Sequence, residues 1–146
     1  MKDKYKEKAN VKVIFVGAFG ETLDGAVGGQ LHACQTLIKS EISRHVDFIF
    51  IDSTMETVPP PSLRRRAYLA AKRLFNFTMQ LIRNDFDTAL IFTSAGFSFL
   101  EKGLMVLVAD ILGVRTVISP RSGLLIDNIE KSLIMQRYVR FILSRC

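Results

Sequence analysis

Residues 11–17 read Val-Lys-Val-Ile-Phe-Val-Gly, and the glycine-rich stretch that follows them ends in Gly28-Gly29-Gln30. The first run is rich in β-branched and aromatic residues and ends at a glycine, which is typical of a buried strand. From Gln30 to Lys39 the apolar residues recur at the spacing of a helix. A strand that leads through a glycine-rich loop into a helix indicates an α/β fold.

The alternation of strands and helices continues along the rest of the chain. Three further apolar runs have the composition of strands, and they span residues 46–51, 88–93 and 115–119. The helical patterns that separate and follow them span residues 30–39, 62–83, 99–112 and 129–144. Apolar strands that alternate with helices predict a parallel sheet with right-handed crossovers. We therefore expect a Rossmann-like open parallel sheet of about four strands, in the order 3-2-1-4, flanked by helices.

The composition is that of one globular domain. The chain has 146 residues, of which 49% are hydrophobic and 23% are charged, and this length supports one core but not a two-domain enzyme. Residues 1–10 carry four lysines and predict a basic disordered tail, which leaves residues 11–146 as the domain. The formal net charge of +6 favours anionic partners such as phosphates or an acidic membrane face.

Cysteine usage and the lengths of the apolar runs predict a cytoplasmic protein. Cys34 and Cys146 lack metal-ligand spacing, and two such cysteines are typical of a reduced compartment. No apolar stretch reaches the roughly 18 residues of a membrane span, and the run at 13–16 is too short for the core of a signal peptide. Peripheral contact with the anionic inner face of a membrane is expected from the basic residues Arg64, Arg65, Arg66, Lys72 and Arg73.

Ligands of open parallel sheets bind beyond the carboxyl ends of the strands, so the loops after the four strands are the candidate site. The Gly28-Gly29-Gln30 turn opens a helix, where free amides and the helix dipole favour a phosphate; a flexible loop is the alternative interpretation. Arg121 offers a cation with several donors, or else it bonds loop carbonyls. The candidates in the later loops, for the acceptor or the cleft, are Ser94, Gly96, Arg121, Ser122 and Gly123.

Motif spacing excludes several other kinds of site. The sequence lacks the P-loop pattern, the Gly-x-Gly-x-x-Gly pattern of a dinucleotide site and the Gly-x-Ser-x-Gly elbow of serine hydrolases. His32 and His45 have no partner at metal-ligand spacing, and the acidic pair at 85–87 precedes a strand, at the wrong end of the sheet. We expect no metal and no cofactor. Asp52, which ends the second strand, leaves a dinucleotide-dependent oxidoreductase half-domain open as an alternative.

The opening strand, its loop and Gly28-Gly29-Gln30 resemble the beginning of the GT-B-fold glycosyltransferases of family 4. The resemblance extends over nearly all of residues 11–146 through Phe99, Lys102, Ala109, Gly113 and the strand Thr116-Val117-Ile118. Members of this family usually follow that strand with a His-Gly turn, whereas this chain has Arg121-Ser122-Gly123 in its place.

The resemblance implies one of two Rossmann-like domains that face each other across a cleft. The first domain holds the acceptor, and its glycine turn, here Gly28-Gly29 with Gln30, approaches the diphosphate of the donor. The second holds the nucleotide sugar, usually with two glutamates eight residues apart, and no two glutamates of this chain have that spacing. The chain therefore resembles an incomplete N-terminal domain, a fragment without its donor-binding domain.

By this resemblance, the chain is expected to be the acceptor-side domain of a retaining glycosyltransferase in glycan or polysaccharide biosynthesis, inactive in isolation. Its expected partners are a nucleotide sugar, a sugar or lipid-linked acceptor and a separate donor domain, but no nucleic acid. A stand-alone module that binds a phosphorylated or nucleotide ligand remains an alternative. We also expect the fourth strand to lie at an edge of the sheet, where unpaired backbone groups promote association.

Overall fold

The computed structural model describes residues 10–25 and 28–146. In chain order the elements are β1 (Val11–Gly17), α1 (Gly29–Lys39), the short 3-10 helix η1 (Glu41–Arg44), β2 (Val46–Asp52), α2 (Leu63–Arg83), β3 (Thr88–Thr93), α3 (Phe97–Ile111), β4 (Arg115–Pro120), α4 (Leu124–Lys131) and α5 (Leu133–Leu143). The tail predicted at residues 1–10 lies outside the described residues except for Asn10, whose side-chain amide donates to Asp47 Oδ1 at 3.0 Å.

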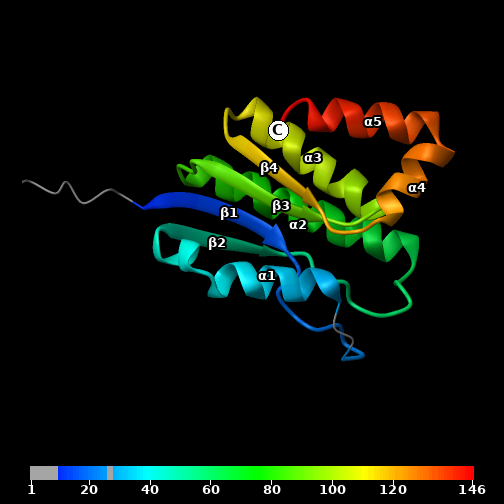
Figure 1. The fold of residues 1–146 in the computed structure, drawn as a ribbon, viewed down its shortest axis with the longest axis horizontal. Helices are drawn as coiled ribbons and strands as arrows, with labels where there is room; N and C mark the ends of the chain where they lie inside the picture. The colour runs from blue at the N-terminus through cyan, green and yellow to red at the C-terminus, as the bar shows by residue number, and fades with distance from the viewer. Residues whose placement is uncertain (1–9, 26–27) are drawn as a thin grey trace, which may run out of the picture.

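Four parallel strands form one sheet in the order β2-β1-β3-β4 (Figure 1). The predicted α/β class and the open parallel sheet are confirmed, but the predicted order 3-2-1-4 is wrong, because β3 pairs with β1 and not with β2. Side-chain burial gives the reason. β3 buries Ala89, Ile91, Phe92 and Thr93, which suits an interior strand, whereas β2 buries only Ile51 and therefore fits an edge. β4 lies at the opposite edge, as expected.

The strand order places a topological switch point between β1 and β3. The chain leaves β1 toward β2 and then crosses back over β1 to β3, so the direction of winding reverses there. Right-handed crossovers put α1 on one face of the sheet and α2 and α3 on the other, as Figure 1 shows. A ligand crevice opens outside the carboxyl ends of the strands at such a point, so the loops after β1 and β3 border it.

The larger core lies between the sheet and the helices α2, α3 and α5. Its most buried large side chains are Ile14, Val16, Phe77, Ile91, Phe99, Met105 and Ile142. Gly103 of α3 allows α5 to lie close, because an added Cβ there would collide with the hydroxyl of Tyr138. That hydroxyl donates to the carbonyl oxygen of Leu100 at 3.0 Å, and the Tyr138 ring contacts Phe99, so Tyr138 helps to hold α5 against α3.

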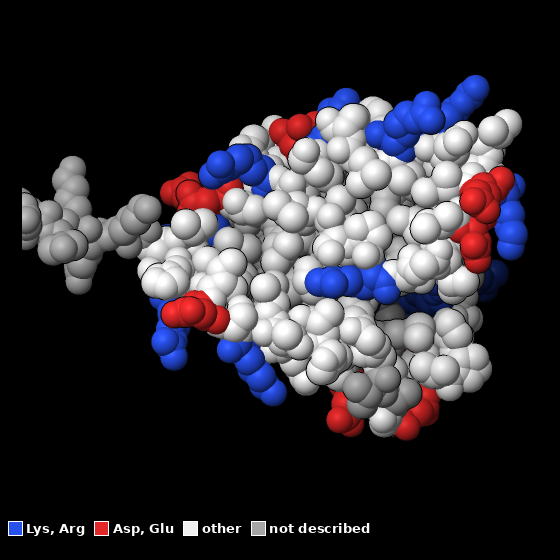
Figure 2. All heavy atoms as spheres, in the orientation of Figure 1, with Lys and Arg blue, Asp and Glu red and all other residues white. Residues whose placement is uncertain are grey.

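A smaller cluster fills the space between α1 and the sheet. Its buried members are Phe15, Cys34 and Phe92, and the Cys34 side chain packs so closely on the end of β1 that a Cβ at Gly17 would lie 2.6 Å from its Sγ. On β4, at the edge of the sheet, Val117 stays 52% exposed. In the view of Figure 2 the charged side chains lie mainly around the rim, and the centre is largely uncharged.

The end of the chain differs from the predicted single helix over 129–144. It forms two helices, α4 and α5, and the break lies at Ser132, whose extended backbone has φ −144° and ψ 113°. The Ser132 side chain accepts a hydrogen bond from the backbone N–H of Met135 at 3.3 Å, so it caps α5. The helical part also begins earlier than predicted, since α4 starts at Leu124 and not at residue 129.

The other helix ends follow their sequence signals. Ser62 caps α2 by accepting from the backbone N–H of Arg65 at 3.4 Å, and Gly113 takes φ +72° after α3, a conformation that glycine adopts readily. α3 begins at Phe97, two residues before the predicted start. Within the described part of the chain, no helix combines the length and the apolar character that a membrane crossing requires.

Candidate functional site

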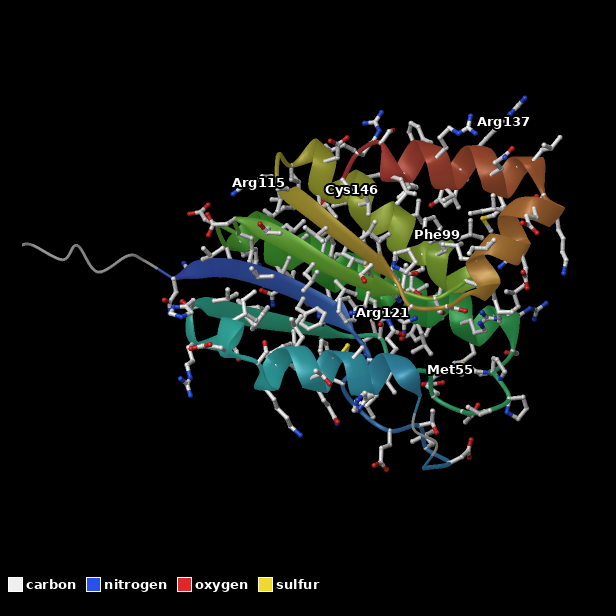
Figure 3. The ribbon with its side chains drawn as sticks, in the orientation of Figure 1. Met55, Phe99, Arg115, Arg121, Arg137 and Cys146 are labelled. Carbon is white, nitrogen blue, oxygen red and sulfur yellow. The ribbon has the colours of Figure 1, made fainter. Side chains whose placement is uncertain are left out.

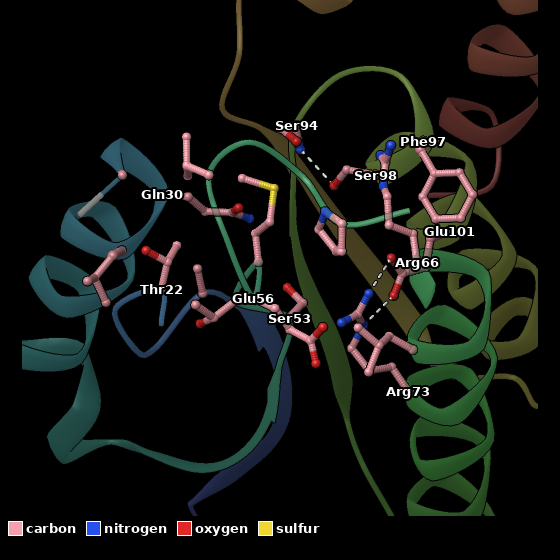
Figure 4. A pocket seen from close by; sticks show the side chains of 18 of the residues that line it. Thr22, Gln30, Ser53, Glu56, Arg66, Arg73, Ser94, Phe97, Ser98 and Glu101 are labelled. Carbon is pink, nitrogen blue, oxygen red and sulfur yellow. Dashed lines mark hydrogen bonds and ion pairs between the residues drawn. The ribbon is translucent and has the colours of Figure 1, made fainter. Parts of the chain in front are cut away.

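A cavity of about 490 Å³ opens at the carboxyl ends of β1, β2 and β3, at the switch point of the sheet (Figure 4). It lies between the beginnings of three helices. Gly28 and Gln30 line it from the start of α1, Arg66 from the first turn of α2, and Phe97 from the start of α3. The cavity therefore occupies the place where open α/β sheets bind their ligands.

The three helix starts that border the cavity favour a negatively charged ligand. None of the three helices has an acidic residue in its first turn. α1 and α3 follow Gly28 and Gly96, and neither has a side-chain cap. First-turn amides and the positive end of the helix dipole favour anions. The backbone at this end of the sheet is therefore arranged for a negatively charged group.

A buried cluster of three charged side chains, Arg73, Glu101 and Lys102, forms part of the cavity wall. Nε and Nη2 of Arg73 donate to Oε1 and Oε2 of Glu101 at 2.6 and 3.0 Å, in bidentate geometry. Nζ of Lys102 lies 3.2 Å from Oε2 of Glu101. The side chains of Glu101 and Lys102 are only 4% and 3% exposed. Two cations share one carboxylate, so the cluster carries a formal charge of +1.

Burial and pairing shift the pKa of both residues of α3 in this cluster. Burial alone would raise the pKa of Glu101, but the hydrogen bonds and charges of Arg73 and Lys102 hold it below its ordinary value. Burial lowers the pKa of Lys102, and the charge of Glu101 offsets only part of that effect. Glu101 is thus ionised at neutral pH, while the Lys102 ammonium lacks full compensation for its lost hydration.

Arg66, in the first turn of α2, adds a further cation to the wall of the cavity. Its guanidinium carbon lies 4.6 Å from the centre of the Phe97 ring, so the side chain rests on an aromatic face. Glu56 also lines the cavity, but Arg65 binds its carboxylate with bonds of 3.0 and 2.7 Å. In the described residues no carboxylate forms an ion pair with Arg66, so its charge is available to a ligand.

Gln30 projects from α1 toward the same space (Figure 4). Its Nε2 is buried and has no hydrogen-bond acceptor within the described part of the chain. A buried donor in this state costs about 1–3 kcal/mol, which an oxygen atom of a bound ligand would offset. No atom lies within 4 Å of a Cβ built on Gly28, so the start of α1 is open to a ligand.

The cavity brings together three of the eight residues predicted for the site. Gly28, Gln30 and Ser94 line it. Gly29 and Gly96 adjoin lining residues in the chain but do not line the cavity themselves. The three residues of the turn after β4 lie outside it: Arg121, Ser122 and Gly123.

Arg121 lies over the sheet on the same side as α1 (Figure 3). Its guanidinium carbon lies 4.3 Å from the centre of the Phe92 ring, and its backbone N–H donates to the carbonyl oxygen of Thr93 at 2.7 Å. Burial raises the pKa of the Cys34 thiol, and the charge of Arg121 opposes this shift. The side chain of Arg121 therefore covers the edge of the smaller core and does not face the cavity.

Asp52 joins the loops that follow β1 and β2. Its Oδ1 accepts from the backbone N–H groups of Phe19 and Thr54 at 3.2 and 2.9 Å, and from the Thr54 hydroxyl at 2.6 Å. The Thr54 hydroxyl oxygen in turn accepts from the N–H groups of Phe19 and Gly20. This arrangement favours a structural role for Asp52 over the binding of a ribose.

Reasoning from the sequence missed the charged cluster as a unit. From the sequence alone, Arg73 was interpreted as one of a group of basic residues and Lys102 as one of the residues that carry the family resemblance. Glu101 was assigned no role. A signal was present, because Glu101 and Lys102 are adjacent charged residues in a helix that is otherwise apolar from 99 to 109. Two neighbouring charges inside a mostly apolar helix indicate a buried polar site that needs partners.

No protein-family model, no curated protein and no solved structure matches this chain. Among the described residues, no group of three or more His, Cys, Asp and Glu side chains is placed to hold a metal ion.

Proposed function

We propose that this chain is the acceptor-side domain of a retaining glycosyltransferase that uses a nucleotide sugar, in glycan or polysaccharide biosynthesis. The observation that carries the proposal is the cavity at the switch point, where Gly28 and Gln30 of α1 share one space with Arg66 and Ser94. A nucleotide sugar is both anionic and rich in hydroxyls. The cavity offers the start of α1 to the phosphates, and it offers serine hydroxyls to the sugar.

In this proposal the start of α1 faces the donor. Charge develops on the diphosphate as the glycosidic bond breaks, and the open amides at Gly29 and Gln30 stabilise it. The walls formed by α2 and α3 hold the acceptor, a sugar or a lipid-linked sugar. Holding two reactants together supplies about 7–11 kcal/mol of the barrier, and one wall of a cleft cannot do this. A separate donor domain is therefore part of the active enzyme, and this chain alone has no turnover.

We place the same domain at the anionic inner face of a membrane. α2 contains no acidic residue, and its six cations are Arg64, Arg65, Arg66, Lys72, Arg73 and Arg83. Tyr68, Phe75 and Ile82 follow one another every seven residues along one side of this helix and are 60%, 65% and 60% exposed. Exposed apolar side chains that are flanked by cations on one helix are typical of binding at a lipid interface.

A titration followed by nuclear magnetic resonance tests the donor side of the proposal. The ¹⁵N-labelled chain is titrated with uridine, guanosine and adenosine diphosphates, and we expect at least one to shift the amide resonances of residues 28–31. Gly29→Val adds a β-branched side chain at the helix start and is expected to abolish these shifts. Gly113→Asn, a change at a glycine outside the cavity, serves as the control. Absence of shifts with all three nucleotides, or their persistence in Gly29→Val, would contradict the donor-side assignment.

A stand-alone module that binds a phosphorylated ligand is the second candidate, because the cluster of Arg73, Glu101 and Lys102 favours an anion without requiring a reaction. Activity separates the two candidates. Addition of a donor-binding domain to the chain is expected to produce hydrolysis or transfer of a nucleotide sugar that neither part shows alone. Nucleotide binding without any such activity would favour the binding module.

Sedimentation with lipid vesicles tests the membrane contact. We expect the chain to bind phosphatidylcholine vesicles that contain phosphatidylglycerol and not to bind vesicles of pure phosphatidylcholine. The binding should weaken at high salt. Phe75→Glu is expected to abolish binding. Ile111→Glu, at an α3 side chain that is 81% exposed, introduces the same charge elsewhere and should retain it. Equal loss of binding in both variants would show that net charge alone governs the contact.

A further inference from the structure

We propose that Arg73, Lys102 and Arg66, with Glu101 between the first two, form a subsite for a phosphate group within the cavity, and that this phosphate belongs to the acceptor. The three cations line the same cavity, and Glu101 holds Arg73 and Lys102 at a fixed separation through one carboxylate. Assigning the phosphate to the acceptor rests on the proposed function, whereas the subsite itself rests on the geometry and charge of the cavity.

The charge of the cavity matches that of a phosphate monoester. The cavity wall carries three cations, Arg66, Arg73 and Lys102, and two carboxylates, Glu56 and Glu101. Arg65, which does not line the cavity, pairs with Glu56 and neutralises it. The formal surplus is two positive charges. A phosphate monoester carries about −1.5 to −2 near pH 7, so it suits a site with an excess of positive charge, which a neutral sugar does not neutralise. Asp52, outside the lining, also acts on Lys102 through its charge.

The donors near the cluster suit the oxygens of a phosphate. An ammonium group has three donors, and Glu101 is the one carboxylate within ion-pair distance of Lys102 among the described residues. Ser98 also lines this part of the cavity; its Oγ accepts from the backbone N–H of Ser94 at 3.3 Å (Figure 4) and forms a second hydrogen bond with Thr93 Oγ1 at 3.4 Å. The uncapped first turn of α3 adds backbone amides at the same place.

Glu101 acts in this subsite as a positioning residue. Its carboxylate fixes the guanidinium of Arg73 in bidentate geometry and holds Lys102 beside it. Without a ligand it compensates part of the buried positive charge, and burial still lowers the pKa of Lys102. A bound phosphate supplies the remaining negative charge, so its binding raises the pKa of Lys102.

Calorimetric titration of the chain with inorganic phosphate and with a hexose 1-phosphate tests the subsite. Lys102→Met keeps an unbranched side chain, shorter by one atom, and removes its charge, and we expect both ligands to bind at least tenfold more weakly. Arg64→Gln removes a cation from the same helix as Arg66 but outside the cavity, and we expect a change of less than twofold. Tighter binding of the hexose 1-phosphate than of inorganic phosphate assigns the subsite to a sugar phosphate.

A second measurement on the unchanged chain keeps the inference testable if Lys102→Met does not fold. The Lys102 side-chain resonance is followed against pH with and without phosphate, and phosphate is expected to raise its pKa. An unchanged pKa, or undiminished phosphate binding by folded Lys102→Met, would overturn the subsite. A negative result here would overturn the phosphate subsite but not the proposed function. The proposed function is tested separately, by the amide resonance shifts of residues 28–31 with nucleotides and by sugar transfer with an added donor domain.

Discussion

Replacement of Glu101 by glutamine probes the charged cluster most severely. The change removes the one carboxylate that Arg73 and Lys102 share, while the side chain keeps its size. Breaking a buried ion pair costs about 3–5 kcal/mol because the remaining charge stays buried and unpaired. The Arg73 side chain retains 20% exposure, and Lys102 can lose its proton, so we expect the lower end of that range, about 3 kcal/mol. Such a loss is a large part of the stability of a domain of this size.

Urea unfolding, followed by circular dichroism at pH 7, measures this loss directly. Glu56→Gln is the matched control, since it removes the same group from a bidentate pair with Arg65 that lies at the surface, and we expect a much smaller effect. The double variant Glu101→Gln with Lys102→Met should recover part of the loss, because it removes one of the two unpaired cations. A loss below about 1 kcal/mol for Glu101→Gln would refute the view that the cluster is desolvated and tightly coupled.

The pH dependence of stability and the contact between α3 and α5 give further tests. Because the folded pKa of Glu101 lies below its ordinary value of 4.5, its contribution to stability is complete above that pH and is lost as the pH falls through the folded pKa. Wild type and Glu101→Gln should therefore converge in acid. The folded pKa of Lys102 lies below its ordinary value of 10.5. Between these two pKa values the unfolded chain binds more protons than the folded chain, so the stability of wild type should rise with pH toward 10.5. The rise should be smaller in Lys102→Met. Gly103→Ala is expected to destabilise the fold by about 1–3 kcal/mol in thermal unfolding, because the added Cβ displaces Tyr138. Gly123→Ala, whose added Cβ meets nothing within 4 Å, should be nearly neutral.

The local pattern of the sequence was sufficient to predict the helices and strands, but not to predict which strands lie next to one another in the sheet. Periodicity and composition predicted the four strands and most helix ends, because propensity, capping and apolar spacing are local properties. The order of the strands depends on which strand is buried on both faces. Asp47 and the exposed Phe50 mark β2 as an edge strand, but the spacing of strands along the chain carries no such information.

The same distinction applies to the site. Gly28 and Gln30 were predicted from the glycine turn that opens a helix, and Ser94 from its place in the loop after the third strand, because ligands of such sheets bind beyond the carboxyl ends of the strands. Arg121 was misplaced relative to that crevice, because it continues the alternation of Val117 and Ser119, which places it on the α1 face. The partners Arg73 and Glu101 are 28 residues apart on different helices. Their pairing depends on the packing of α2 against α3, which local sequence does not specify.

The most direct test of the central claim is a crystal structure of the chain with a hexose 1-phosphate. We expect the ligand to occupy the cavity between the starts of α1, α2 and α3, with its phosphate within hydrogen-bond distance of Lys102. A phosphate bound by the exposed cations of α2, or beside Arg121 over the sheet, with no ligand in the cavity, would contradict it.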